Sequence, residues 1–197
     1  MAAVVSDRAG FPVVTLLVAA GGLALMALPG LSHWLVYDRE HVLAGEVWRL
    51  VTGHAVHFSW SHAGWNLALF SLAGVWLERH ARVPYLWLIS CTALAGGLCF
   101  LVFMPDMARY GGLSGVVSAM VVYLALIEMR QPGPTRMLWG AILLLFAAKV
   151  GYELLVGRAL FAAPGATPFE VAPVAHIIGA AVAAALFFAP SAIRRSA

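Results

Sequence analysis

A serine with glycine neighbours begins a long uncharged segment, in the stretch GGLSGVVSAM that runs from Gly111 to Met120. This residue, Ser114, could be a nucleophile if a neighbouring base, most often a histidine, removes the hydroxyl proton. Gly112 and Gly115 would then allow a substrate and other backbone segments to approach closely. The same small residues also suit close packing between membrane helices, so the stretch by itself leaves catalysis and packing as alternatives.

Three more polar side chains are expected near the depth of Ser114. His176 stands about four residues into a second uncharged segment, and His62 and Asn66 stand one turn apart at the head of a third. If the helix of Ser114 begins near Gly112, the serine lies ~3–6 Å inside it and His176 lies ~6 Å inside its own helix. Polar groups at membrane depth are costly and usually functional, so this agreement in depth favours a shared site.

The four side chains have the types needed for peptide-bond hydrolysis. Ser114 and His176 could form a nucleophile and general base, and no acidic residue lies near His176 in the sequence, so we expect a dyad. His62, Asn66 and the backbone N–H of Ser114 could donate hydrogen bonds to the oxyanion of the tetrahedral intermediate. Each residue alone has an ordinary structural explanation, such as interhelical hydrogen bonding for Asn66.

The composition predicts that these residues lie in a membrane. The chain is 62% hydrophobic and 11% charged, with a mean hydropathy of +0.90, which excludes an ordinary soluble domain. Uncharged runs near or above the ~18–20 residues that span a bilayer occupy residues 9–37, 50–77, 83–105, 111–127 and 171–193. We therefore predict an all-α polytopic membrane protein with six transmembrane helices, in a single domain over residues 1–197.

The expected helices cover about 11–30, 62–79, 84–103, 112–129, 137–157 and 172–189. Residues 31–61 form a long loop between the first two helices, and its tryptophans suit a position in the membrane interface. Short tails are expected at about 1–10 and 190–197. The first apolar run is expected to be a true span, because one basic residue precedes it and no convincing signal-peptide cleavage site follows it.

The arginines predict the orientation. With the N-terminus inside, the inner segments hold Arg8, Arg79, Arg82, Arg130, Arg136, Arg194 and Arg195, and the outer segments hold Arg39, Arg49, Arg109 and Arg158. This excess predicts cytoplasmic termini and a site that opens to the opposite side of the membrane. The formal net charge of +3 contains no basic block, so the lipid bilayer is an expected partner and nucleic acid is not.

Lys149 and Glu153 are the charged residues of the helix expected at 137–157. Their i,i+4 spacing allows an ion pair on one helix face, which lowers the free-energy cost of burying either residue. They lie ~18 and ~24 Å from the inner end of that helix, near the level of Ser114. The pair could be purely structural, or it could shape the entry of a substrate.

No cofactor or metal is expected. His54, His57 and His62 are close in sequence, but no carboxylate or cysteine ligand accompanies them.

The order of several motifs resembles the rhomboid intramembrane serine proteases. These motifs, which lie between about residues 45 and 185, are Trp48-Arg49, His57, His62–Asn66 as HxxxN, Glu78, Gly112–Gly115 as GLSG and Ala175–Gly179 as AHIIG. The resemblance implies a six-helix rhomboid fold, Ser114 as nucleophile, His176 as general base and His62 with Asn66 as oxyanion donors. It also implies structural roles for Trp48-Arg49 and Glu78.

A closer similarity, to the rhombosortase subgroup, is carried by Tyr37–Arg39, Gly45–Leu50 and Ala148–Glu153. It implies a protein of the bacterial inner membrane that cleaves membrane-anchored substrates with a C-terminal Gly-Gly motif, near the periplasmic end of their transmembrane helix. Ser118 departs from the pattern, because many rhomboids have tyrosine and rhombosortases often have histidine at this position. How His176 is held is therefore open, and Ser118 joins Gly112, Gly115 and His57 as a residue expected to shape the site.

A different function would be that of a non-catalytic rhomboid-like protein that binds membrane helices. Loss of the serine or the histidine would indicate that class, and both Ser114 and His176 are present. A third possibility, a membrane protein that binds a metal or cofactor through its histidines, would show as bound metal or haem absorbance after purification.

Overall fold

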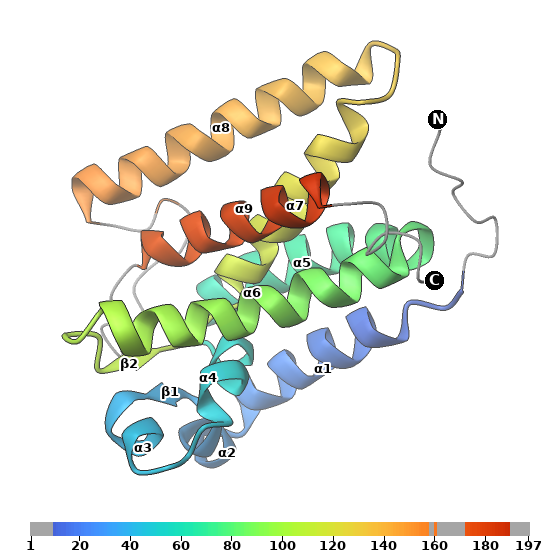
Figure 1. The fold of residues 1–197 in the computed structure, drawn as a ribbon. Coiled ribbons are helices and arrows are strands. Elements are labelled where there is room, and N and C mark those ends of the chain that lie inside the picture. Colours follow the sequence, from blue (N-terminus) through green and yellow to red (C-terminus); the bar gives the residue numbers. More distant parts are fainter. Residues whose placement is uncertain (1–9, 158–159, 161–171, 190–197) are drawn as a thin grey trace.

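The computed structural model describes residues 10–157, 160 and 172–189, and these are mainly helical (Figure 1). The elements are α1 (Val13–Ala27), α2 (Pro29–Leu35), β1 (Tyr37–Asp38), α3 (Arg39–Leu43), α4 (Arg49–Thr52), the 3₁₀ helix η1 (Gly53–Ala55), α5 (Trp60–His80), α6 (Arg82–Phe103), β2 (Arg109–Tyr110), α7 (Ser114–Glu128), α8 (Thr135–Val156) and α9 (Pro173–Phe188). The six longest, α1 and α5 to α9, correspond to the six predicted segments, which confirms the all-α polytopic class.

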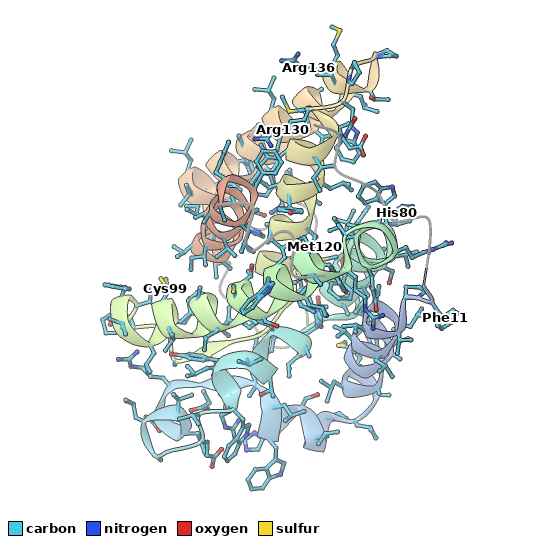
Figure 2. The ribbon with its side chains drawn as sticks, turned by 45° about the vertical axis from the view of Figure 1, so that its right-hand side comes forward. Phe11, His80, Cys99, Met120, Arg130 and Arg136 are labelled. Atoms are coloured by element: carbon cyan, nitrogen blue, oxygen red, sulfur yellow. The ribbon has the colours of Figure 1, made fainter. Side chains whose placement is uncertain are left out.

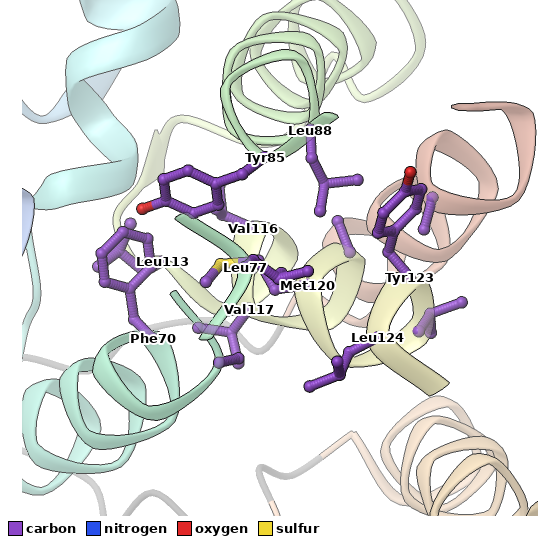
Figure 3. Packing of buried hydrophobic residues seen from close by; sticks show 14 of the residues in the cluster. Phe70, Leu77, Tyr85, Leu88, Leu113, Val116, Val117, Met120, Tyr123 and Leu124 are labelled. Carbon is purple, nitrogen blue, oxygen red and sulfur yellow. The ribbon is translucent and has the colours of Figure 1, made fainter. Parts of the chain in front are cut away.

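Helix α7 is enclosed by the other helices. It contacts α5, α6, α8 and α9, and Figure 3 shows its residues Val116, Val117 and Met120 packed with Leu77 and Tyr85. At 15 residues it is ~22 Å long, shorter than the ~30 Å hydrocarbon core of a bilayer. Because neighbouring helices rather than lipid surround it, α7 does not need to reach both membrane surfaces.

Two described helices, α6 and α8, are each long and apolar enough to cross a membrane alone. Helices α1 and α2 are long and apolar enough to cross a membrane only when they are taken together, and they are bent by 118° relative to each other. The prediction of one helix over 11–30 is therefore wrong at its end. Pro29 begins α2 in a new direction, because proline cannot donate the hydrogen bond that would continue α1.

The loop predicted over residues 31–61 is itself folded into short helices and a strand. Strand β1 pairs antiparallel with β2, in the register Tyr37 to Tyr110 and Asp38 to Arg109. This pairing joins the loop to the chain just before Ser114. Tyr37 is 1% exposed, so its side chain belongs to the core.

Arg49 joins several parts of the loop over residues 31–61 through hydrogen bonds. Its side chain is buried and donates hydrogen bonds to Glu46 Oε2 at 2.6 Å, His33 O at 2.8 Å and Val36 O at 2.9 Å. A buried guanidinium with charged and carbonyl acceptors is well satisfied. These contacts give Arg49 a structural place in the loop.

Glu78 joins the beginning of α1 to α5. Its carboxylate accepts hydrogen bonds from Val14 N at 2.9 Å, Thr15 N at 2.8 Å and Thr15 Oγ1 at 2.8 Å. The first backbone N–H groups of a helix have no acceptor within the helix, so a carboxylate from another helix satisfies them here.

Figure 2 shows Met120 within the bundle and Arg130 and Arg136 near the α7–α8 turn, beyond the end of α7 that is opposite Ser114.

Candidate active site

Ser114 is the first residue of α7, so the predicted start of this helix near Gly112 is wrong by two residues. Gly112 has φ +138°, a conformation that residues with a side chain rarely adopt, and the chain turns there before the helix begins. The serine consequently stands at the N-terminus of the helix, as the first residue of its first turn. The backbone N–H groups of Ser114 and Gly115 therefore have no acceptor within the helix.

Helices α7 and α9 touch backbone to backbone beside Ser114. A Cβ atom at Gly115 would lie 2.9 Å from Ala175 O, and one at Gly179 would overlap Gly115 O. His176 follows Ala175 and is buried in the first turns of α9. The glycines therefore serve close packing, and this packing also brings the serine and the histidine to the same place.

Ser118 connects the two predicted catalytic residues. Its Oγ donates to Ser114 O at 2.7 Å and lies 2.9 Å from His176 Nδ1. A hydroxyl has one proton, and the carbonyl of Ser114 can only accept, so Ser118 accepts its second hydrogen bond from Nδ1–H. The Nδ1 proton leaves a lone pair on Nε2 of the neutral ring, which is the atom that a general base needs.

The other side of His176 faces α8. Lys149 Nζ lies 3.1 Å from His176 Nε2 and 2.8 Å from Glu153 Oε2, which itself lies 3.2 Å from Nε2. The predicted pairing of Lys149 with Glu153 is confirmed, and its contact with the histidine was not predicted. Within the described part of the chain, no hydrogen bond joins Ser114 directly to His176.

His62 and Asn66 border the turn that precedes Ser114. A Cβ atom at Gly112 would lie 2.7 Å from His62 Cε1 and 3.7 Å from Asn66 Nδ2. Only glycine leaves room for the two side chains at this turn. Asn66 is buried, and its Nδ2 has no hydrogen-bond partner among the described residues. A buried donor in this state is suited to an acceptor that arrives with the substrate.

His57 lies behind the same turn. Its Nε2 faces Leu113 N at 3.5 Å, and its ring lies edge-on to that of His62 with centroids 5.2 Å apart. Burial, with a further contribution from the charge of His62, lowers the pKa of His57 to about 3. The ring is therefore neutral near pH 7 and can accept the weak hydrogen bond that supports the turn.

Tyr110 is a site residue that the sequence did not indicate. Its hydroxyl donates to Gly112 O at 2.8 Å. Burial raises the pKa of Tyr110 to about 12, against the opposing effects of hydrogen bonds with the Ser114 side chain and the Gly115 backbone. The residue is placed by the pairing of β2 with β1, which no local sequence pattern predicts.

His54 does not join the other histidines. Its Nε2 lies 2.9 Å from Ala93 O of α6, and its ring packs 5.3 Å from that of Tyr110. Among the residues with described positions, no group of three or more histidine, cysteine, aspartate or glutamate side chains is arranged to hold a metal ion.

Comparisons with known proteins point to one family. A family model described as the rhomboid domain matches residues 44–192. The rhomboid protease GlpG of Photorhabdus laumondii is 34% identical over 102 residues, which are 50% of this chain and 34% of that protein. The protein of the same name from Salmonella newport is 32% identical over 136 residues, which are 66% of this chain and 48% of that protein.

The chain thus spans about a third to a half of the length of these curated relatives. The matched domain nevertheless includes α5 to α9, the helices that carry the residues around Ser114 and His176. The protein, a multi-pass membrane protein, belongs to the rhomboid family.

Proposed function

We propose that this protein is an intramembrane serine endopeptidase in which Ser114 is the nucleophile and His176 the general base. The observation that carries the proposal is the Ser118 hydroxyl, which bonds both to the carbonyl of Ser114 and to His176 Nδ1. This bridge fixes the ring tautomer that leaves Nε2 able to accept a proton. The relatives named rhomboid proteases support the same activity.

The reaction would proceed through an acyl-enzyme. Ser114 Oγ attacks the carbonyl carbon of the scissile bond while its proton passes to His176 Nε2. Asn66 Nδ2, His62 and the backbone N–H of Ser114 at the start of α7 are the donors proposed for the oxyanion. His176 then protonates the departing amine, and water attacks the acyl-enzyme with the same histidine as base.

The absence of a direct bond between Ser114 and His176 does not oppose this role. Hydrogen bonds between catalytic groups are often long or poorly aligned in the free enzyme and shorten only with substrate bound. In the structure Nε2 is engaged by Lys149 instead.

The substrates that we propose are membrane-anchored proteins with a Gly-Gly motif next to a C-terminal transmembrane helix, as implied by the resemblance to rhombosortases. A peptide bond within a helix is inaccessible to a nucleophile, and glycine weakens helices by about 1 kcal/mol relative to alanine. Two glycines would therefore ease the local unwinding that cleavage requires. The proposed location is the bacterial inner membrane, with cytoplasmic termini and a site open to the periplasm.

The test is cleavage of a reporter with a Gly-Gly transmembrane tail, co-expressed with the wild type or with the Ser114→Ala variant. Ser90→Ala is a matched control, because Ser90 is an exposed serine of α6. Cleavage by the wild type and by Ser90→Ala, but not by Ser114→Ala, is expected, with mass spectrometry locating the cut near the glycines.

Two other outcomes would separate the parts of the proposal. Equal processing by Ser114→Ala would exclude Ser114 as nucleophile and favour a non-catalytic helix-binding protein. Cleavage of a general rhomboid substrate without cleavage of the Gly-Gly reporter would keep the protease and reject the rhombosortase-type specificity.

A further inference from the structure

The proposed general base, His176, is already engaged in a hydrogen bond in this structure. Nε2 of His176 has one in-plane lone pair, and Lys149 Nζ donates to it at 3.1 Å. A general base that accepts a hydrogen bond from an ammonium group cannot accept the Ser114 proton at the same time. The positive charge of Lys149 also opposes the imidazolium that proton transfer would create.

Lys149 is held in this position by Glu153. The carboxylate is 2% exposed and lies 2.8 Å from Nζ, whereas the Lys149 side chain is 21% exposed. Glu153 Oε1 also accepts a hydrogen bond from Leu160 N at 3.2 Å. The carboxylate is thus fixed, and the Lys149 side chain is the more exposed of the two.

Helix α8, which carries both residues, is less embedded than its neighbours. Val150 and Glu153 are its buried residues, and Leu144 and Leu155 are exposed. It packs mainly against α7 and α9, at the edge of the bundle in Figure 1. A substrate that enters beside α8 would therefore meet Lys149 next to the catalytic groups.

We infer that Lys149 is a substrate-responsive positioning residue, which caps His176 Nε2 in the free protein and transfers this hydrogen bond to a main-chain carbonyl of the bound substrate. The inference rests on the proposed function. Transfer would free Nε2 for the Ser114 proton only when a substrate is in place. Glu153 would remain the partner of the ammonium group in both states, so no charge is left unpaired.

An unwound substrate supplies the acceptor that this transfer needs. Carbonyl groups that lose their helical hydrogen bonds inside a membrane have no water to replace those bonds, so leaving the carbonyls unpaired is unfavourable. An ammonium group has three donors, and Glu153 uses one of them. Lys149 can thus satisfy an exposed carbonyl while its ion pair stays intact.

The test separates the reactivity of Ser114 from the binding of a transmembrane substrate. A small fluorophosphonate probe forms a bond between Ser114 Oγ and phosphorus, expels fluoride and passes the hydroxyl proton to His176. Because it presents no unwound helix, its labelling rate reports how often the base is free. The full-length protein in detergent is compared with Lys149→Met/Glu153→Gln, which removes both charges, and with Leu144→Ala as a control on the exposed face of α8.

The double variant is expected to react roughly tenfold faster with the probe, since one hydrogen bond from a charged group is lost. The same variant should show a raised KM for the transmembrane reporter, because the donor for the substrate carbonyl is also lost. Loss of a purely structural ion pair would not make Ser114 more reactive while it weakens substrate binding. Labelling at or below the wild-type rate, with unchanged thermal stability, would overturn the inference.

A single substitution keeps the test decisive if the double variant does not fold. Glu153→Gln leaves the Lys149 ammonium with His176 as its remaining partner, so labelling should become slower than in the wild type. An equal or faster rate would contradict the inference. If Ser114 is labelled neither in the wild type nor in any variant, and Ser114→Ala still processes the reporter, then the proposed function itself has failed.

Discussion

Two carboxylates are buried among the helices to almost the same extent, Glu78 of α5 at 3% exposure and Glu153 of α8 at 2%. Glu78 accepts hydrogen bonds from the backbone and side chain at the beginning of α1. Glu153 faces a lysine of its own helix and the histidine proposed as general base. Burial and satisfied hydrogen bonds are thus common to both, and the identity of the partners separates the structural carboxylate from the one for which we propose a function.

The largest effect is expected on the structural side of this comparison. Glu78→Ala should lower the free energy of unfolding by about 3 kcal/mol, because three donors of α1 lose their acceptor. Unfolding in detergent would measure the loss, and activity per folded molecule should stay at the wild-type level. A variant with full stability and lost cleavage would place Glu78 in the mechanism and remove the contrast with Glu153.

The opposite pattern is expected for Glu153→Gln. Cleavage of the reporter should fall roughly tenfold, because Lys149 then remains on His176, while the free energy of unfolding changes by about 1 kcal/mol or less. The kcat of the purified variant and its unfolding midpoint are the two measurements. A loss of stability as large as that of Glu78→Ala would show that both carboxylates have a structural role.

Ser118 contacts the other ring nitrogen of His176, Nδ1, and its substitution tests whether this contact also matters for activity. Ser118→Ala removes the acceptor for Nδ1–H, so the ring is no longer held in its tautomer and orientation. A roughly fivefold decrease in kcat at constant KM is expected from the loss of one neutral hydrogen bond. Wild-type kcat in this variant, with Ser90→Ala again as control, would mean that packing alone holds the ring.

The smallest effect is expected for a third buried carboxylate, that of Asp38. Like Glu153 it is buried beside side-chain partners, but these are His41 of α3 and Arg109 of β2 and not a residue proposed to be catalytic. Burial alone would raise its pKa, yet hydrogen bonds with His41 and Arg109 outweigh this effect and lower the pKa of Asp38 to about 2.

The folded-state pKa of Asp38 is thus below its unfolded value of 3.8, so its stabilisation is complete above about pH 4 and is lost as the pH falls towards 2. Asp38→Asn should reduce the free energy of unfolding at pH 7 by about 1 kcal/mol, since water screens the exposed partners. Its unfolding should also depend less on pH between 4 and 2. Reduced cleavage at unchanged stability would contradict this assignment.

The long apolar segments were predictable from the sequence, whereas the short elements between them were not. Runs without charge predict the helices because the bilayer excludes unpaired charges. The start of α7 was placed too early because Gly112, at φ +138°, turns the chain where composition alone would continue a helix. The pairing of β1 with β2 could not be predicted, since it joins two-residue strands about 70 residues apart.

The residues of the site were more predictable than their contacts. Ser114, His176, His62 and Asn66 stood out because polar side chains are rare in apolar segments. Their hydrogen bonds depend on side-chain conformations and on the approach of α8 to α9, which sequence spacing does not specify. The engagement of His176 by Lys149 is such a contact.

The order of α7, α8 and α9 along the chain has a consequence for biosynthesis. Ribosomes release a chain from its N-terminus, so the helix of Ser114 enters the membrane before the helix of His176, with α8 between them. If Ser114 and His176 are the proposed nucleophile and base, a growing chain would hold the serine without its base and could not attack other nascent proteins at the insertion machinery. When α9 finally joins the bundle, the Lys149 ammonium is already present to cap its histidine.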